Sequence, residues 1–174
     1  MREVVDAGRI HRLLSALADA ARHDGRVYLT GGATAVLLGW RATTIDVDLK
    51  FVPDQDEVLR AIPELKERLQ VNVELASPVD FIPVAPDWED RSPFIERIRR
   101  LDFRHFDLYA QALAKLERGH RQDLADVHEM VSRGLIEPDG ALAYLVRIEP
   151  NLYRYPAIDA PAFRQAVEDF FRRG

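Results

Sequence analysis

The sequence predicts an α/β (α+β) protein in which a small mixed sheet flanked by helices is followed by a largely helical C-terminal part. Short apolar segments with strand-like alternation lie in the first 90 residues, glycine and proline turns separate them from helical segments, and helical periodicity dominates after residue 91. With 174 residues, we expect one domain, with an α/β core over 1–90 and a mainly helical part over 91–174 packed on it.

Hydrophobic periodicity and turn residues assign the elements in order along the chain. In the helix expected over 54–69, Asp54 or Asp56 is the expected cap, and Pro63 either kinks the helix or starts a second one. The expected strands are 27–30, 45–51 and 71–75, with a further short strand near 101–106. The expected helices are 4–21, 33–38, 54–69, 92–100, 107–118, 121–133, 139–149 and 160–173.

The composition is that of a folded protein without thiol chemistry. Hydrophobic residues make up 47% of the chain, and the absence of cysteine excludes disulfides and zinc–thiolate sites. The net charge of −5 excludes a uniformly basic surface for nucleic acid. No apolar segment approaches the roughly 20 residues that span a bilayer, and no signal-peptide core is present, so we expect a cytoplasmic protein without a membrane partner.

A pair of aspartates carries the clearest chemical signal. Strict alternation over 45–51 makes Asp46 and Asp48 project from one face of a strand, about 7 Å apart. Two carboxylates on one face repel each other unless a cation lies between them, and hard oxygen ligands suit Mg²⁺ or Mn²⁺. A divalent-metal site is therefore expected. The alternate residues, which should enter the core, are Ile45, Val47, Leu49 and Phe51.

The position of this pair distinguishes it from a chance occurrence. Asp54 and Asp56 have the same spacing but lie in a turn before a helix, where capping explains them. The first pair follows the single Gly-Gly of the chain, Gly31-Gly32, at a strand-to-helix turn where bare backbone can receive a phosphate. The alternatives are a solvent-facing edge strand for the aspartates and an ordinary turn for the glycines.

Two stretches resemble a known superfamily. Leu29-Thr30-Gly31-Gly32 followed by Arg41-Ala42-Thr43-Thr44-Ile45-Asp46-Val47-Asp48 is similar to the signature of polymerase-beta-like nucleotidyltransferases, in which Gly-Gly or Gly-Ser precedes an Asp-x-Asp metal pair. The resemblance is closest to the AbiEii-type toxin branch, in which a helical lysine precedes an Arg-x-x-Asp-like stretch. Here these are Lys115-Leu116 and Arg121-Gln122-Asp123-Leu124-Ala125-Asp126-Val127. The resemblance covers roughly residues 26–134.

The resemblance implies roles for the matched residues. Gly31 and Gly32 would let the backbone approach a triphosphate such as ATP, with Thr44 beside the phosphates, and Asp46 and Asp48 would hold Mg²⁺ or Mn²⁺. Lys115 would neutralise the β- and γ-phosphates.

Two assignments stay open. Asp123 would assist near the acceptor hydroxyl or fix Lys115, although it could also simply cap its helix, as Lys115 could be a surface lysine. The third carboxylate of the superfamily is Glu74, on the non-core face of its strand with Asn72, or Asp80, which follows a bend.

The implied activity is transfer of a nucleoside monophosphate from a nucleoside triphosphate to an acceptor hydroxyl. Resemblance to the toxin branch implies a tRNA end as acceptor and a cognate antitoxin as partner. The arginines of 91–104, with Arg118, Arg121 and Arg133, would then gather its phosphates. The alternatives are a protein or small-molecule hydroxyl as acceptor, or a non-catalytic nucleotide-binding domain of this fold. The preferred base and the oligomeric state leave no signal in the sequence.

Overall fold

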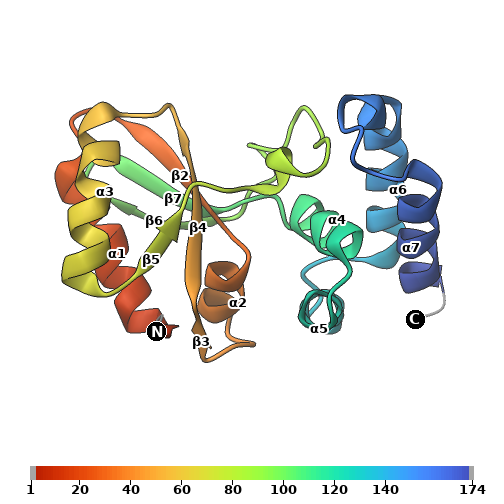
Figure 1. Ribbon diagram of the computed structural model, residues 1–174, viewed down its shortest axis with the longest axis horizontal. Coiled ribbons are helices and arrows are strands. Elements are labelled where there is room, and N and C mark those ends of the chain that lie inside the picture. Colours follow the sequence, from red (N-terminus) through yellow and green to blue (C-terminus); the bar gives the residue numbers. More distant parts are fainter. Residues whose placement is uncertain (1–2, 173–174) are drawn as a thin grey trace. The chain divides into compact units, whose positions relative to one another are not determined.

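The computed structural model describes residues 3–172, which fall into two compact units (Figure 1). Unit 1 is formed by the chain up to Ser77 together with Ser92–His105. Unit 2 is formed by Pro78–Arg91 together with the chain from Phe106 onward. Helices accompany a mixed sheet in unit 1 and a group of helices makes up most of unit 2, which confirms the predicted fold class.

A five-stranded mixed sheet of order β5-β4-β2-β7-β6 forms the centre of unit 1. Strand β4 runs antiparallel to β2 and parallel to β5, so it is an interior strand. The alternative of a solvent-facing edge strand for the two aspartates is therefore wrong. The strands are β2 (Gly25–Thr30), β4 (Asp46–Val52), β5 (Asn72–Glu74), β6 (Phe94–Ile98) and β7 (Leu101–His105).

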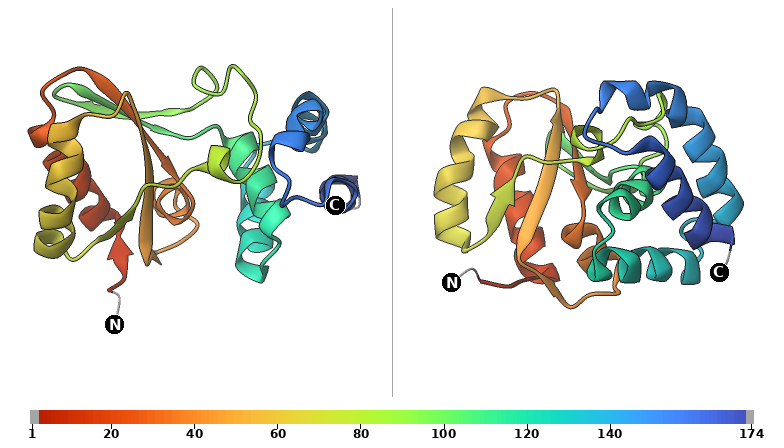
Figure 2. Two further views of the ribbon diagram at one scale, coloured as in Figure 1. Left: turned by 45° about the horizontal axis from the view of Figure 1, so that its top comes forward. Right: turned by 45° about the vertical axis from the view of Figure 1, so that its right-hand side comes forward.

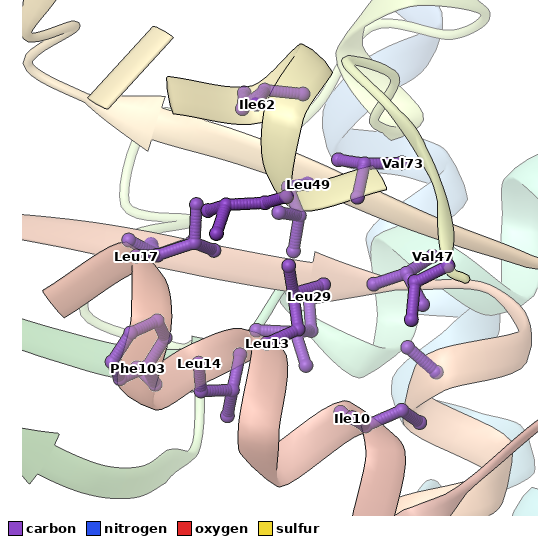
Figure 3. Packing of buried hydrophobic residues seen from close by; sticks show 14 of the residues in the cluster. Ile10, Leu13, Leu14, Leu17, Leu29, Val47, Leu49, Ile62, Val73 and Phe103 are labelled. Carbon is purple, nitrogen blue, oxygen red and sulfur yellow. The ribbon is translucent and has the colours of Figure 1, made fainter. Parts of the chain in front are cut away.

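Two helices cover one face of this sheet and form the core with it (Figure 3). Helices α1 (Ala7–Ala20) and α3 (Asp56–Leu69) contribute apolar side chains at helical spacing, which pack on inward-facing residues of β2, β4 and β7. Val47, Leu49 and Phe51 of β4 are buried in this core as predicted. Ile45 is 48% exposed, because β4 begins only at Asp46.

The N-terminal residues of unit 1 form a strand where the sequence suggested helix. Strand β1 (Val5–Asp6) pairs antiparallel with β3 (Thr43–Thr44), so the first helix starts at Ala7, with the Asp6 carboxylate accepting a hydrogen bond from the Arg9 backbone N–H. The short helix α2 (Gly32–Leu38) ends at Gly39 as predicted.

The cap of helix α3 differs from the prediction. Gln55, rather than Asp54 or Asp56, is the N-cap residue, and the helix continues through Pro63. The buried Gln55 side chain bonds instead to the backbone of the loop before β2, accepting from Arg22 N and His23 N and donating to His23 O. Gln55 thus occupies the N-cap position of α3, while its side chain holds the loop before β2.

The helix predicted over 92–100 is wrong, because this segment forms β6 and the turn of a hairpin with β7. Arg99 occupies the turn with a φ of 52°, a left-handed conformation in which glycine or asparagine is the usual turn signal. The hairpin therefore lacked its sequence signature.

Unit 2 is built around α4 (Leu108–Arg118), which contacts each of the three other long helices (Figure 2). These are α5 (Arg121–Ser132), α6 (Pro138–Ile148) and α7 (Ala160–Arg172), close to the predicted ranges. Two short 3₁₀ helices, η1 (Pro78–Asp80) and η2 (Glu149–Arg154), complete it. Among residues 3–172, no helix is both long and apolar enough to cross a membrane.

Segment 78–91 is anchored to the helices of unit 2 by one cluster of side chains. Arg91 donates to Asp107 over 3.1 Å, and its guanidinium lies over the rings of Tyr109 and Tyr144, about 5 Å from each centroid. The Tyr144 hydroxyl accepts from the Ala85 backbone N–H at 3.0 Å. Burial raises the pKa of Asp107, and the charge of Arg91 opposes that rise.

Candidate functional site

The Gly31-Gly32 turn packs directly against the segment that carries the aspartates. Gly31 has a φ of 65°, and a Cβ there would lie 3.1 Å from Oδ2 of Asp48. A Cβ on Gly32 would lie 2.0 Å from Oγ1 of Thr44, which no side chain tolerates. In the sheet, Thr30 is paired with Asp48, so the end of β2 delivers the turn to the carboxylate. Both glycines are therefore required by close approach of the backbone.

A buried histidine supports this turn from the neighbouring strand. Oγ1 of Thr34, in α2, lies 3.0 Å from Nδ1 of His105 at the end of β7. Burial lowers the pKa of His105 to about 4, so its imidazole is neutral at pH 7. The contact ties α2 to the sheet immediately after the glycine turn.

Three carboxylates project from the same face of the two neighbouring strands β4 and β5. Asp46 is paired in register with Asn72, and Asp48 with Glu74. We call Asp46, Asp48 and Glu74 the acidic face; Asp46 and Asp48 are half-buried and Glu74 is exposed. Across residues 3–172, no three His, Asp or Glu side chains converge closely enough to enclose a metal ion. The acidic face is therefore a surface shared by groups of like charge, and its carboxylate oxygens are spread along two strands.

Asn72 lies within the acidic face and contacts two of its members. Its Nδ2 donates to Oδ1 of Asp46 over 2.6 Å and to Oε1 of Glu74 over 3.3 Å. The sequence placed Asn72 on the correct face but gave no sign of this contact, because its partner Asp46 lies 26 positions away.

Lys115 of α4 is buried in unit 2, so the alternative of a surface lysine is wrong. Its Nζ donates to Oδ2 of Asp126 at 2.8 Å and lies 4.0 Å from Oδ1 of Asp123. Asp126, 0% exposed, was not singled out in the sequence as the partner of Lys115. A usable signal was an acidic residue three positions after Asp123, on the same side of the helix.

Asp123 of α5 is held by several donors at once. Arg118 donates to its two carboxylate oxygens at 2.8 and 2.5 Å, and the His120 backbone N–H donates at 3.2 Å, as expected for a capping residue. Burial acts to raise the pKa of Asp123, but hydrogen bonding and charge from Arg118 outweigh it, and the pKa is lowered. We call Lys115, Arg118, Asp123 and Asp126 the buried ion cluster; Arg118 is its one exposed member.

The candidate residues are thus gathered in two sets, each within one unit. Gly31, Gly32, Thr44 and the acidic face lie together in unit 1. The buried ion cluster and Asp80 belong to unit 2.

Most arginines expected to meet RNA phosphates have acidic partners inside the protein. Arg97 pairs with Asp24 and Asp102, and Arg99 pairs with Asp19. Further pairs are Arg91 with Asp107, Arg100 with Asp24, Arg118 with Asp123, and Arg133 with Glu129. Arg104 instead donates to the Ser92 carbonyl. Because most of these positive charges have an acidic neighbour, the arginines of 91–104 do not form a broad basic surface.

Comparison with known protein families identifies one match. A family model described as nucleotidyltransferase of unknown function (DUF6036) matches residues 9–140, which is more than half of the chain. The matched range contains the glycine turn, the acidic face and the buried ion cluster. No curated protein matches the chain, and no solved structure does.

Proposed function

Since the chain belongs to the family of nucleotidyltransferases of unknown function (DUF6036), we propose that it transfers a nucleoside monophosphate from a nucleoside triphosphate to an acceptor hydroxyl. The observation that carries this proposal is the close packing of the Asp48 carboxylate against the bare backbone of Gly31. This arrangement offers a nucleotide both a carboxylate for its metal and a turn with no side chain in the way of its phosphates.

The acidic face fits a divalent cation such as Mg²⁺ or Mn²⁺. Mg²⁺ is usually held by one or two carboxylates together with substrate phosphates and water, which two aspartates on one strand face provide without a closed cage. Asp46 and Asp48 would hold the ion, and Glu74 is favoured over Asp80 as a third carboxylate because it pairs in register with Asp48. When bound, the metal supplies neutralisation of phosphate charge.

The chain's own residues position the reactants. Gly31 and Gly32 would give the phosphates access to the backbone. Thr44, whose hydroxyl donates to the Asp46 carbonyl at 3.1 Å, would lie beside the phosphates. The acceptor oxygen forms a bond to the α-phosphorus, the bond to the bridging oxygen breaks, and pyrophosphate leaves, while the hydroxyl proton passes to a carboxylate or to solvent.

For Lys115 and Asp123 we propose the roles that the resemblance implies. Lys115 would place its charge near the β- and γ-phosphates, held in one orientation by Asp126. The lowered pKa of Asp123 makes it a weak proton acceptor, which supports the role of fixing the lysine and the start of α5.

The acceptor is the finer part of the proposal. The resemblance to AbiEii-type toxins supports a tRNA end, and with it a cognate antitoxin as binding partner. The pairing of the arginines with internal acids supports the second candidate, a hydroxyl of a protein or small molecule, because such an acceptor needs no wide basic surface.

The test is transfer of label from α-labelled nucleoside triphosphates, with Mg²⁺, to total RNA or to protein. We expect labelled acceptor and released pyrophosphate, both reduced at least about 100-fold by Asp46→Ala or Asp48→Ala. Asp54→Ala is the matched control, since it removes an exposed aspartate with the same sequence spacing and should leave the rate unchanged. Nucleotide binding without pyrophosphate release in any fraction would instead identify a non-catalytic binding domain.

A further inference from the structure

We infer that Asn72 is a positioning residue for the metal, because it holds the carboxylates of Asp46 and Glu74 in the orientation in which they would bind a divalent cation. The inference rests on the proposed function, because it assigns a role to a neighbour of the proposed ligands. It adds an uncharged residue to the three carboxylates proposed for the metal site.

The geometry of Asn72 makes one amide group serve two carboxylates. The strand register sets it directly beside Asp46, and the alternation of β5 sets it on the same face as Glu74. Its Nδ2 lies 2.6 Å from Asp46 and 3.3 Å from Glu74. An amide nitrogen carries two hydrogens, so both contacts can be made at once. Because carboxylates only accept hydrogen bonds, the nitrogen of this amide, and not its oxygen, must face them.

A neutral donor at position 72 has a specific advantage in a group of like charges. An aspartate here would add a fourth negative charge, and a lysine or arginine would compete with the metal for the same carboxylates. An asparagine orients the carboxylates through hydrogen bonds while leaving their charge for a cation.

The place of Asn72 in the fold makes this role separable from folding. It begins β5, a strand of three residues at the edge of the sheet, and it is half-buried. The core contribution of this strand comes from its neighbour Val73, which faces the opposite side. Replacing the Asn72 side chain should therefore change metal affinity more than stability.

The test measures Mn²⁺ binding to the full chain by the loss of the free-ion electron paramagnetic resonance signal, without nucleotide. Asn72→Leu keeps the size and removes the amide, and we expect the Mn²⁺ dissociation constant to rise about 10-fold or more. Gln165→Leu is the matched control, because it removes a similar amide-to-carboxylate bond, from Gln165 to Asp169 at 2.7 Å, on a helix of unit 2. Its Mn²⁺ affinity should match the wild type.

The outcomes separate this inference from the proposed function. If Asp46→Asn removes Mn²⁺ binding while Asn72→Leu leaves it unchanged, the positioning role is wrong and the metal site stands. If the wild-type chain binds no Mn²⁺, the carboxylates do not hold a metal without nucleotide and the inference is overturned. If Asp46→Asn binds Mn²⁺ normally, the proposed metal site itself fails. A lowered melting temperature in Asn72→Leu with normal Mn²⁺ affinity shows a structural role and also overturns the inference. Should Asn72→Leu not fold, Asn72→Ala replaces it under the same criteria.

Discussion

The acidic face of unit 1 and the buried ion cluster of unit 2 accommodate negative charge in different ways. On the acidic face, Asp46 accepts a hydrogen bond from a neutral amide and shares a half-exposed strand surface with another carboxylate. In the buried ion cluster, Asp123 and Asp126 are almost completely buried and are bound by Arg118 and Lys115. The first arrangement gathers carboxylates on a half-exposed strand surface, and the second pairs buried carboxylates with a buried lysine and an exposed arginine.

This difference predicts where stability and activity reside. A buried ion that loses its partner must stay desolvated without compensation, which is costly for folding. An exposed carboxylate such as Glu74 contributes little to folding. Substitutions in the two clusters should therefore separate, with the largest losses of stability in unit 2.

The largest expected effect is at Asp126. Asp126→Ala leaves the Lys115 ammonium buried, with the Asp123 carboxylate 4.0 Å away as its remaining acidic neighbour, and should lower the free energy of unfolding by about 3–5 kcal/mol. Urea denaturation measures this loss. Adding Lys115→Met should recover part of the stability, because the unpaired charge is then gone. A loss below about 1 kcal/mol for the single variant would mean that the cluster is not desolvated.

The next largest effect concerns His105, a neutral buried residue outside both clusters. The folded-state pKa of His105 is about 4, below its usual 6.5, so the unfolded chain takes up the proton first as pH falls. Stability from this histidine is complete above pH 6.5 and is lost toward pH 4, by about 3 kcal/mol in all. His105→Gln should remove this slope from the unfolding free energy measured against pH. Parallel profiles for variant and wild type would contradict it.

A smaller effect tests the close packing of the glycine turn. Gly32→Ala places a Cβ against the Thr44 side chain and should cost about 1–3 kcal/mol of unfolding free energy, measured by thermal or urea denaturation. Combining it with Thr44→Gly should relieve the contact. Gly8→Ala, in α1 with its nearest contact at 3.6 Å, is the control and should not destabilise. Equal stability of Gly32→Ala and wild type would show that the turn has room to spare.

The smallest effect is expected on the acidic face. Glu74→Gln removes one like charge from an exposed position and should change the free energy of unfolding by less than about 0.5 kcal/mol. Chemical denaturation measures stability, and a Mn²⁺ titration of the same variant tests Glu74 as a third carboxylate. A destabilisation above about 1 kcal/mol would break the distinction between the two clusters.

The sequence predicted the parts of the fold whose signals are local. Alternation identified the strand that carries Asp46 and Asp48, and the glycine pair identified the turn packed against it. The hairpin of β6 and β7 was missed, because Arg99 adopts a left-handed turn conformation that an arginine does not predict.

The candidate site was predicted only as far as its motifs extend. Contacts between distant positions were not accessible, since Asn72 meets Asp46 and His105 meets Thr34 only once the sheet has formed. The pairing of Lys115 with Asp126 likewise depends on how two helices pack. Motifs identify the candidate residues. The orientation of their side chains depends on partners far away in the sequence, which no rule of residue spacing predicts.

The two-residue pairing of β1 with β3 has a practical consequence. Val5 is paired with Thr44, so the start of the described chain is the direct neighbour of the segment that packs on Gly32. Changes to the chain ahead of β1 are therefore separated by few residues from the strand pair that holds this segment. Recombinant protein intended for ligand assays should accordingly carry its tag after α7. A shortened variant starting at Ala7 would show how far the pairing of β1 with β3 stabilises the segment that packs on Gly32.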